Sequence, residues 1–302
     1  MYSSLAVPLS PRDFHDRIYA GEIVRFGELS PMQALVAFTR GLLEEAFFPH
    51  RPPEIHRHLS HDRQVEEFSR LQKAFVQSQQ VKRLWSEVFA TLGLDPEKLA
   101  RDRLHLRFQP HQEPAANLPR ARSTATIAFH RDTWGSNLYA QTNWWAPIYP
   151  ITAGRTFAIY PDLWSRAVPN TSASFDLEAV LARAKIAGRH AVDADDAIPH
   201  LNGSVDVGSV EPVVIEPGEV IAFSSAHAHA GVPNSTDFTR ISLETRTLWI
   251  EDVEAGRGAP NVDGDAPWMA PGWFRRVSDG TRLTELLGLD ALEPYRRESP
   301  VA

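Results

Sequence analysis

The first third of the chain carries apolar residues at helical spacing. Ser30-Pro31 is typical of a helix start, with Ser30 as the expected N-cap and proline at the first helical position. Apolar side chains then recur every three or four residues as far as Phe47, and prolines at 49–53 end the pattern. A second amphipathic region runs from about Asp62 to Leu94. The pattern predicts a helical part over about 30–98.

From about residue 103 the spacing changes to that of short strands. Seven runs alternate or are rich in β-branched and aromatic residues: RLHLRFQ, TATIAF, NLYAQTNWWAPIYPI, RTFAIYP, EPVVIEP, GEVIAFSS and TRISLETRTLWIED. A helix at about 174–187 and a Gly/Asp-rich insert at 188–209 interrupt them. Helices followed by strands predict an α+β chain whose strands form one barrel or sandwich.

No linker separates the two parts, so we expect one domain over 1–302. Within it we expect the helical part, a β core at about 103–250 and a C-terminal extension at 251–302. No stretch approaches the roughly 20 apolar residues of a membrane helix. The N-terminus lacks the pattern of a signal peptide. These features favour a cytoplasmic protein.

The net charge and the absence of cysteine limit the partners and the reaction types that this chain can have. The net charge of −7 argues against nucleic acid as a partner, and we expect a small-molecule substrate, no membrane partner, and a monomer or homodimer. The chain of 302 residues has no cysteine, which excludes disulfides, thiolate catalysis and iron–sulfur clusters. Any metal must therefore be held by histidine and carboxylate.

Two His-x-acid pairs are candidates for such a site, His111-x-Glu113 and His130-x-Asp132. Neither pair is specific alone, and a surface ion pair is the plainer alternative for each. His130 ends the predicted strand TATIAF, and alternate residues of a strand share a face, so His130 and Asp132 can converge on one ion. His229, or its neighbour His227, would complete a set of two imidazoles and one carboxylate, which leaves open positions on an iron ion.

The last long strand predicts a polar, ligand-facing surface. Alternation places Arg240, Ser242, Glu244 and Arg246 on one face, with Ile241, Leu243 and Thr245 on the other. The apolar face should pack on the helices. Burying arginine is costly without a partner, and a dicarboxylate would supply one. The alternatives are a solvated face, or neutralisation of an arginine by Glu244.

These motifs together resemble a known superfamily. The order His130-x-Asp132, His229, Pro233-Asn234 and Arg240-x-Ser242 resembles the iron(II)/2-oxoglutarate-dependent dioxygenases, and within them the phytanoyl-CoA hydroxylase-like group. Arg240 follows His229 by 11 residues, which fits that pattern. The segment NWWAPIYPITAGRTFAIYP resembles the stretch between the two metal motifs. The resemblance covers roughly residues 103–250.

The resemblance implies a double-stranded β-helix, a jelly-roll or cupin-like barrel, with the N-terminal helices packed on the larger sheet. It implies Fe(II) held by His130, Asp132 and His229, and 2-oxoglutarate and O2 as co-substrates, with ascorbate as the reductant in vitro. The co-substrate set that it implies is Arg240 and Ser242 on the distal carboxylate, with Trp145 and Asn143 nearby; Trp144 is the rival of Trp145. Because Asp132 is a carboxylate, halogenation is disfavoured.

The implied activity is oxidation of an unactivated C–H bond of a small molecule, with release of succinate and CO2, in specialised metabolism. Hydroxylation is the expected outcome, although desaturation, cyclisation and epimerisation use the same residues. One alternative is a cupin-type metal-binding barrel that acts as an isomerase or as an oxygenase without 2-oxoglutarate. A non-catalytic ligand-binding barrel is the other.

Substrate contacts are expected near the metal motif and at arginines. Odd positions from 137 to 143 would share a face, and an anionic substrate would engage arginine. The candidates are Trp134, Asn137, Gln141, Arg122, Arg155 and Arg246, each with a surface role as its alternative. Arg246 should lie roughly 20 Å along the strand from Arg240, so we assign it to substrate or to Glu244.

Overall fold

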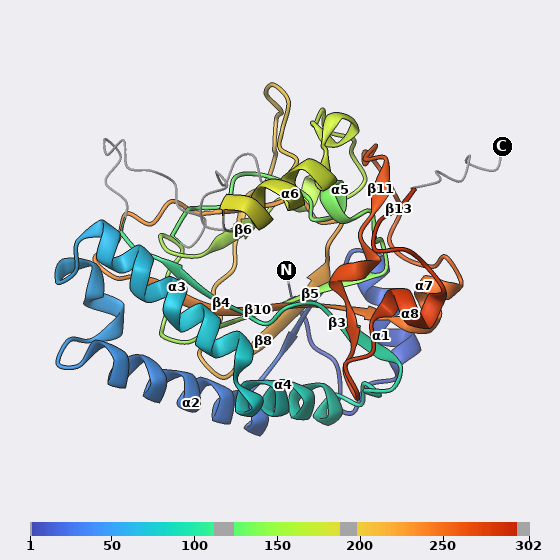
Figure 1. Ribbon diagram of the computed structural model, residues 1–302. Coiled ribbons are helices and arrows are strands. Elements are labelled where there is room, and N and C mark those ends of the chain that lie inside the picture. The colour runs from blue at the N-terminus through green and yellow to red at the C-terminus, as the bar shows by residue number, and fades with distance from the viewer. Residues whose placement is uncertain (1, 112–123, 188–197, 295–302) are drawn as a thin grey trace.

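The computed structural model describes residues 2–111, 124–187 and 198–294, apart from the side chains of 184–187. The chain forms a mixed α+β fold around one large sheet (Figure 1). The helices are α1 (Pro11–Tyr19), α2 (Ser30–Phe47), α3 (His61–Gln77), α4 (Gln79–Thr91), α5 (Thr133–Ser136), α6 (Leu177–Ala187), α7 (Ile250–Glu254) and α8 (Leu283–Leu287). Single turns of 3₁₀ helix lie at Pro52–Arg57, Pro161–Leu163, Ser172–Ser174 and Pro271–Trp273.

The large sheet has eight strands in the order β1-β2-β8-β5-β10-β3-β12, with β4 also paired to β10. They are β1 (Tyr2–Ser3), β2 (Ile23–Phe26), β3 (Leu99–Arg101), β4 (His105–Gln109), β5 (Gln141–Pro147), β8 (Val220–Ser224), β10 (Arg240–Trp249) and β12 (Arg275–Arg276). A second sheet has the order β7-β6-β9, with β7 (Glu211–Pro212), β6 (Phe157–Ile159) and β9 (His229–Gly231). A short pair joins β11 (Trp268–Met269) to β13 (Glu293–Pro294).

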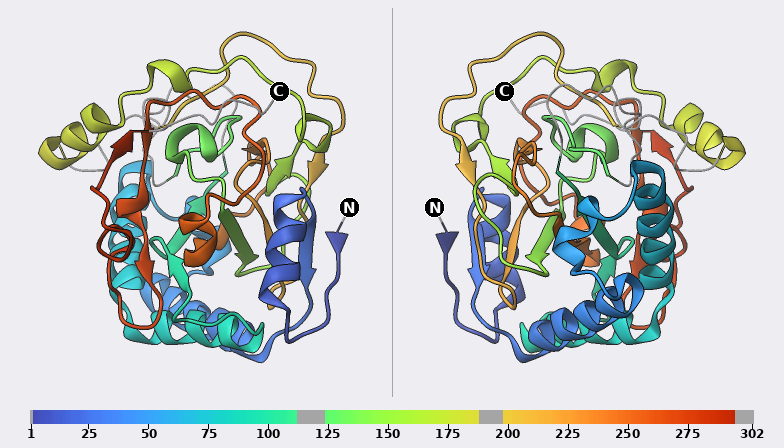
Figure 2. Two further views of the ribbon diagram at one scale, coloured as in Figure 1. Left: turned by 90° about the vertical axis from the view of Figure 1, so that its right-hand side faces the viewer. Right: turned by 90° about the vertical axis from the view of Figure 1, so that its left-hand side faces the viewer.

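The long helices cover one face of the large sheet, as the apolar pattern predicts. Ile241 and Leu243 of β10 share a core with Leu35 of α2, Phe68 of α3 and Trp85 of α4. Each of these side chains is almost fully buried. Figures 1 and 2 show α2 and α4 along this side, with α6 on the opposite side. Burial of this apolar face fixes the orientation of β10, and its polar residues must therefore point the other way.

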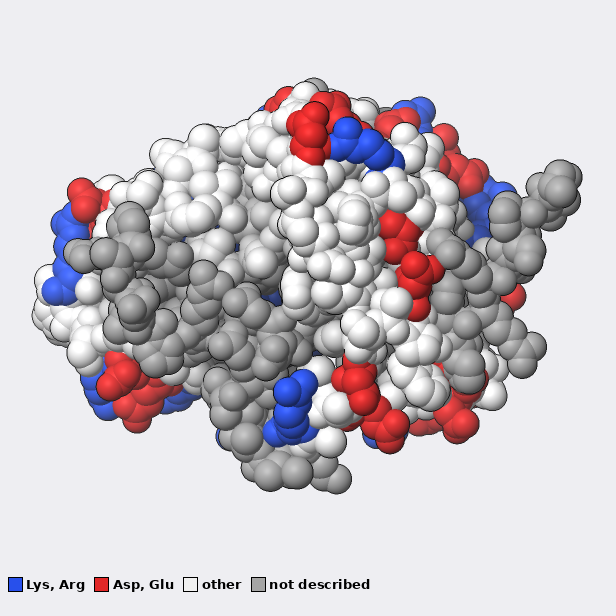
Figure 3. Space-filling view, turned by 90° about the horizontal axis from the view of Figure 1, so that it is seen from above, with Lys and Arg blue, Asp and Glu red and all other residues white. Residues whose placement is uncertain are grey.

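The second sheet packs against the other face. Trp145 of β5 and Phe223 of β8 form a separate apolar cluster with Phe157 and Ile159 of β6. Two sheets thus face each other over part of their length, and the side chains between them include the predicted metal motif. Seen from this side, the described side chains near the middle of the face are mostly uncharged, and charged ones gather toward its edges (Figure 3).

Two helix predictions need correction in detail. Ser30 is the first residue of α2 rather than its cap, since Leu29 holds the N-cap position without a side-chain bond. The region 62–94 forms two helices, because Ser78 both ends α3 and caps α4, where its Oγ accepts a bond from Val81 N at 3.3 Å. A serine cap inside an amphipathic pattern favours such a break.

Two predicted strands are largely absent. In TATIAF, no residue of 124–129 belongs to a strand; Gly231 N donates to Ile127 O at 2.9 Å, and His130 forms a lone bridge with His229. A Cβ on Gly231 would lie 2.8 Å from Thr126 Cγ2, so this segment crosses β9 closely rather than pairing along it. In EPVVIEP, only Glu211–Pro212 is a strand.

None of the helices in the described ranges is both long enough and apolar enough to cross a membrane.

Candidate metal centre and its two cavities

Three potential metal ligands converge between the two sheets. His130 N donates to His229 O at 3.0 Å and His229 N donates to His130 O at 2.9 Å, which fixes the two backbones side by side. Asp132 lies at the start of α5 with φ −61° and ψ −31°. The predicted reason for convergence, strand alternation, is therefore wrong: a helical turn brings the Asp132 carboxylate back toward both imidazoles.

The donor atoms have the spacing of a metal site. Potential ligand atoms of His130, Asp132 and His229 all lie within 4.8 Å of one another. His130 Nδ1 lies 2.9 Å from Ala128 O, and His229 Nδ1 lies 3.0 Å from His227 O. A carbonyl only accepts, so each Nδ1 carries the proton and each Nε2 presents its lone pair. The two Nε2 atoms lie 3.6 and 3.8 Å from the Asp132 oxygens.

The charges also suit a divalent metal. Burial, followed by the nearby His130, lowers the pKa of His229 to about 4, so its imidazole is neutral at pH 7. Burial alone would raise the pKa of Asp132, but Arg246 and the two histidines hold it well below its usual range. Two imidazoles and one carboxylate are the donor set of a non-haem iron site with open positions.

Further side chains hold the Asp132 carboxylate in place. Asn143 Nδ2 donates to its Oδ2 at 2.6 Å, and Arg246 Nη2 lies 3.2 Å from its Oδ1. Arg246 Nη1 also donates to Asp102 Oδ2 at 3.3 Å, and Asn143 Oδ1 accepts from Ser225 Oγ at 2.5 Å. Sequence reasoning missed Asp102 and Ser225; the signal for Asp102 was its place directly before the alternating run RLHLRFQ.

This arrangement corrects one of the two partners expected for Arg246, namely Glu244; a contact with substrate stays a prediction. The partners of Arg246 are Asp102 and Asp132, whereas Glu244 accepts from Arg107 Nε at 2.8 Å. Arg107 is a third residue that the sequence analysis missed. It lies on the face of β4 that His105 and Gln109 share. We considered that Glu244 neutralises an arginine of its own strand, but its ion-pair partner is Arg107 of β4.

A small cavity of about 70 Å³ lies beside the three ligands, with space several times that of one water molecule, roughly 10–15 Å³. Its lining includes all three ligands, Arg107, Trp145 and Arg240. In the described part of the chain, Arg240 Nε and Nη1, Ser242 Oγ and Trp145 Nε1 are buried without a hydrogen-bond partner. Burial lowers the pKa of Arg240 to about 10, since no ion pair offsets it fully. Unsatisfied donors around a cavity indicate a ligand rich in acceptors.

Both tryptophans line the small cavity, but their contacts differ. Trp144 Nε1 donates to Thr247 Oγ1 at 2.8 Å, and its ring packs with Phe14 and Phe26 in the core beneath the helices. Trp145 instead packs against Phe157 between the sheets, with its Nε1 unbonded. Trp145 is therefore the tryptophan available to a ligand.

A large cavity of about 900 Å³ opens from the other side of the ligands. His130, Asp132, Arg246 and Gln141 line its inner end, and residues of α4, β3, α6 and β12 line the rest. Gln141 Nε2 donates to Ser225 Oγ at 2.5 Å, and its Oε1 is buried without a partner among the described atoms. A volume of this size is typical of a pocket for a small organic molecule.

Two of the predicted substrate residues do not belong to either cavity. Trp134 is fully buried and its Nε1 donates to Asp263 Oδ1 at 2.7 Å. Asn137, with φ 51°, ends α5, and its Nδ2 donates to the carbonyls of Ala266 and Trp268. Strand β5 begins only at Gln141, so the alternation that we extended back to residue 137 does not exist there.

Arg155 and Arg122 were also predicted to contact the substrate. Arg155 donates to Pro150 O and lies over the Phe238 ring, and it lines neither cavity. Arg122 lies outside the described residues.

The rival histidines lie apart from the centre. His227 Nε2 lies 3.0 Å from Gly21 O, and burial lowers the pKa of His227 to about 3. His111 Nδ1 lies 3.0 Å from Thr236 O, and Glu113 lies outside the described residues. Within the described ranges, His130, Asp132 and His229 are the group that can hold a metal ion.

Comparison with known proteins gives structural neighbours but no sequence family. No protein-family model matches the chain, and no curated protein matches it. Similar solved structures include a non-heme monooxygenase, ThoJ, in its apo form, with a TM-score of 0.46, 15% identity, and 79% of this chain and 78% of that chain covered. Another is EvdO2 from Micromonospora carbonacea var. aurantiaca complexed with 2-oxoglutarate, with a TM-score of 0.45, 16% identity, and 82% and 94% covered.

A third is the epimerase SnoN in complex with Fe3+, alpha ketoglutarate and nogalamycin RO, with a TM-score of 0.39, 13% identity, and 78% and 84% of the two chains covered. The EvdO2 and SnoN structures hold 2-oxoglutarate, the SnoN structure also holds Fe3+, and none of the three proteins is named as a phytanoyl-CoA hydroxylase. Because all three TM-scores lie below 0.5, the proposed function rests on the residues of the site.

Proposed function

We propose that this protein is an Fe(II)- and 2-oxoglutarate-dependent oxygenase that hydroxylates an unactivated C–H bond of a small molecule and releases succinate and CO2. One observation carries the proposal. A triad of two imidazoles and one carboxylate borders a small cavity lined by Arg240 and Trp145, whose buried donors have no partner among the described atoms, and Ser242 Oγ, on the same face of β10 as Arg240, is also buried without one. A cupin-type isomerase would need the triad but has no use for those donors.

The residues divide into two groups around the metal. Arg240 would receive the distal carboxylate of 2-oxoglutarate through its planar fork, with Ser242 adding a hydrogen bond. Asn143 and Arg246 hold Asp132 toward the histidines. When bound, iron couples the oxidative decarboxylation of 2-oxoglutarate by O2 to oxidation of the neighbouring C–H bond.

The packing around the site serves the same chemistry. Aromatic side chains of the inter-sheet cluster, including Phe157 and Phe223, border the small cavity and exclude water from the co-substrate. The large cavity lies on the other side of the ligands and offers space for the substrate. We further infer that the two facing sheets form a double-stranded β-helix.

Succinate formation tests the proposal directly. The purified protein should convert 2-oxoglutarate to succinate when supplied with Fe(II), ascorbate, O2 and a pool of metabolites, and mass spectrometry should find a product with one added oxygen. Asp132→Ala removes the anionic ligand and should abolish both signals. His111→Ala, which changes a histidine outside the triad, is the control and should keep them.

Equal turnover in wild type and Asp132→Ala would place the chemistry elsewhere. Conversion of substrate without consumption of 2-oxoglutarate would favour the cupin-type alternative instead.

A further inference from the structure

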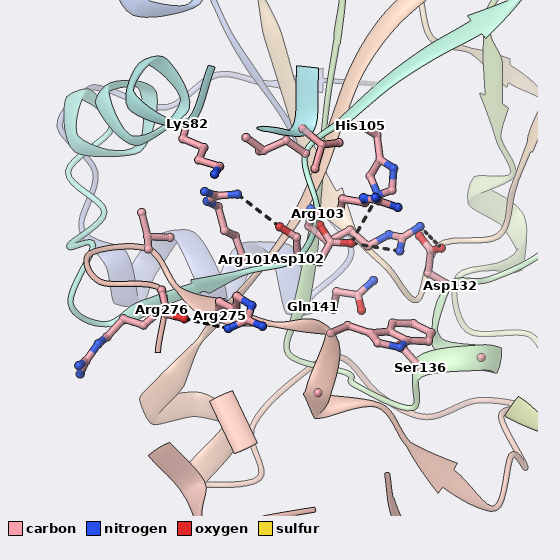
Figure 4. A pocket seen from close by; sticks show the side chains of 18 of the residues that line it. Lys82, Arg101, Asp102, Arg103, His105, Asp132, Ser136, Gln141, Arg275 and Arg276 are labelled. Carbon is pink, nitrogen blue, oxygen red and sulfur yellow. Dashed lines mark hydrogen bonds and ion pairs between the residues drawn. The ribbon is translucent and has the colours of Figure 1, made fainter. Parts of the chain in front are cut away.

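The outer part of the large cavity holds three cations, Lys82 of α4, Arg101 of β3 and Arg275 of β12, which we call the cation cluster. Figure 4 shows the Lys82 and Arg101 side chains pointing toward one another, with Arg275 on the neighbouring segment. The cluster contributes no residue to the proposed metal or co-substrate sites.

Strand pairing forces two of these charges together. Arg101 and Arg275 are direct cross-strand partners in the β3–β12 ladder. Side chains in that relation have Cβ atoms about 4.5–5.5 Å apart, and like charges there destabilise the pair. Lys82 adds a third positive charge from the helix side. Such an arrangement gains stability once an anion lies among the three.

No acidic side chain of the described residues makes an ion pair with any member of the cluster. Arg101 Nη1 reaches only the backbone Asp102 O at 3.5 Å, and its Nε is buried without a partner. Arg275 Nη1 donates to Gly280 O at 3.2 Å. The Asp102 carboxylate, the closest in sequence, binds Arg246 instead.

Other cations along the same cavity show the usual arrangement. Arg83 pairs with Glu87, and Arg276 pairs with Asp279 at 2.5 Å. Burial also lowers the pKa of Arg101, and the nearby Asp102 carboxylate, which is already bound to Arg246, offsets this only in part. The cluster therefore differs from its surroundings in lacking acids, not merely in being basic.

The cavity also has an apolar lining, interspersed with polar residues such as Asp102 and Gln141. It consists of side chains from several elements, among them Leu104, Phe175, Val180, Ile198 and Trp273. A molecule that spans the cavity would thus meet the metal at one end, apolar groups along its body and cations at the other end.

We propose that the substrate is an elongated molecule with an apolar body and a dianionic oxyanion, such as a phosphate monoester, at the end remote from the oxidised C–H bond. This inference rests on the proposed function. Lys82 and Arg101 point toward one another, and Arg275 adds a third cation from the strand paired with that of Arg101, so the combined positive charge suits a dianion whose oxygens match the guanidinium forks. Lys82, Arg101 and Arg275 bind this group. Their distance from the metal then determines which carbon of the substrate lies beside it.

Binding to metal-free protein tests the proposal without any turnover. Titration calorimetry should give an affinity for n-octyl phosphate about 10- to 100-fold higher than for n-octanol, the apolar control, and also higher than for octanoate. Equal affinities for octyl phosphate and octanol would overturn the anion site. Equal affinities for octyl phosphate and octanoate would overturn its dianionic character.

Variants locate the binding. Arg101→Gln and Lys82→Gln should each weaken octyl phosphate binding about tenfold or more. Arg275→Gln, at an exposed position that tolerates substitution, should weaken it as well. Arg83→Gln is the matched control, because it removes a paired cation from the same cavity, and it should change the affinity less than about twofold. Unchanged affinity in all three cluster variants would overturn the assignment.

A thermal readout covers the case in which a buried variant folds poorly. Octyl phosphate should raise the Tm of the wild type more than that of Arg275→Gln. An equal rise in both proteins would contradict the cluster as the binding site.

The two hypotheses fail separately. Octyl phosphate binding at the cluster without any succinate from 2-oxoglutarate would remove the proposed function and leave an anion-binding cavity. Succinate formation with equal affinities for octyl phosphate and octanol would support the proposed function and remove the anion site.

Discussion

The two faces of strand β10 differ in how their side chains are satisfied. On the helix side, Ile241 and Leu243 are almost fully buried among apolar residues. On the other side, Arg240 is 7% exposed and Ser242 fully buried, yet both hold polar atoms without partners. Neighbouring residues of one strand thus have opposite roles.

The difference separates residues that stabilise the fold from residues that await a ligand. A core side chain gains its free energy from neighbours that are present whenever the chain is folded. A buried guanidinium or hydroxyl without a partner costs free energy until an acceptor arrives. Stability and binding should therefore respond to substitutions on opposite faces.

The largest effect is expected from Arg240→Ala. Removal of one partner of a buried charge pair costs about 3–5 kcal/mol, so 2-oxoglutarate binding should weaken by about two to four decades. Anaerobic titration of the Fe(II)-loaded protein measures this, and Arg240→Lys should recover only part of the loss because it lacks the fork. A large loss in Arg246→Ala with little in Arg240→Ala would reverse the assignment.

Leu243→Ala should lower the stability of the protein and leave the binding of 2-oxoglutarate nearly unchanged. It leaves a cavity beneath the helices and should lower the free energy of unfolding by about 2–5 kcal/mol, as measured in urea. Affinity for 2-oxoglutarate should stay within about twofold in the folded protein, because Leu243 lies on the far face. The milder Ile241→Val is its companion, with an expected cost of about 0.5–1.5 kcal/mol. Weakened binding in both would show that the faces are coupled.

Arg246→Met should shift the pH dependence of metal binding. Arg246 is the strongest influence that lowers the pKa of Asp132, so its loss should raise that pKa. A protonated Asp132 is a poor ligand, and Co(II) binding should therefore fail at a higher pH than in wild type. Absorption spectra of Co(II) titrations at several pH values provide the measurement, with Arg155→Met as the control. Identical profiles in all three proteins would refute the role of Arg246.

The effect with the least bearing on binding concerns a histidine outside the proposed metal site. Burial lowers the pKa of His15 to about 4. Between pH 6.5, the usual value in an unfolded chain, and about 4, the unfolded state takes up a proton that the folded state refuses. Stability should fall over this range, and His15 accounts for up to about 3 kcal/mol of the loss. In metal-free protein, His15→Phe should make the decline shallower; an unchanged slope would mean that His15 does not contribute.

Sequence reasoning succeeded where one periodicity dominates. The alternation along β10 predicted which residues face the helices and which lie on the opposite, polar face, because burial of Leu243 leaves no other register. The combination of His130, Asp132 and His229 was also found from the sequence, although through a wrong local structure.

The wrong and missing predictions have two causes, a misassigned local structure and pairing between distant parts of the chain. Asn137 was placed on an extended face, but it is the left-handed end of a short helix that includes Trp134, so strand alternation does not apply there. Asp102 and Arg107 were missed because their partners, Arg246 and Glu244, lie more than a hundred residues away in the chain. Pairing of that kind follows from strand register, which no local pattern specifies.

The reciprocal backbone bonds between His130 and His229 have a consequence for metal choice. They hold the two backbones of the proposed metal site side by side, and each ring has its own Nδ1 contact with a carbonyl, so we expect metal binding to require little rearrangement of the two imidazoles. A site of this donor set follows the Irving–Williams order, in which nickel and copper exceed iron. Which ion occupies it is then decided by supply, and protein that has passed over a nickel resin should need a chelator before iron can enter.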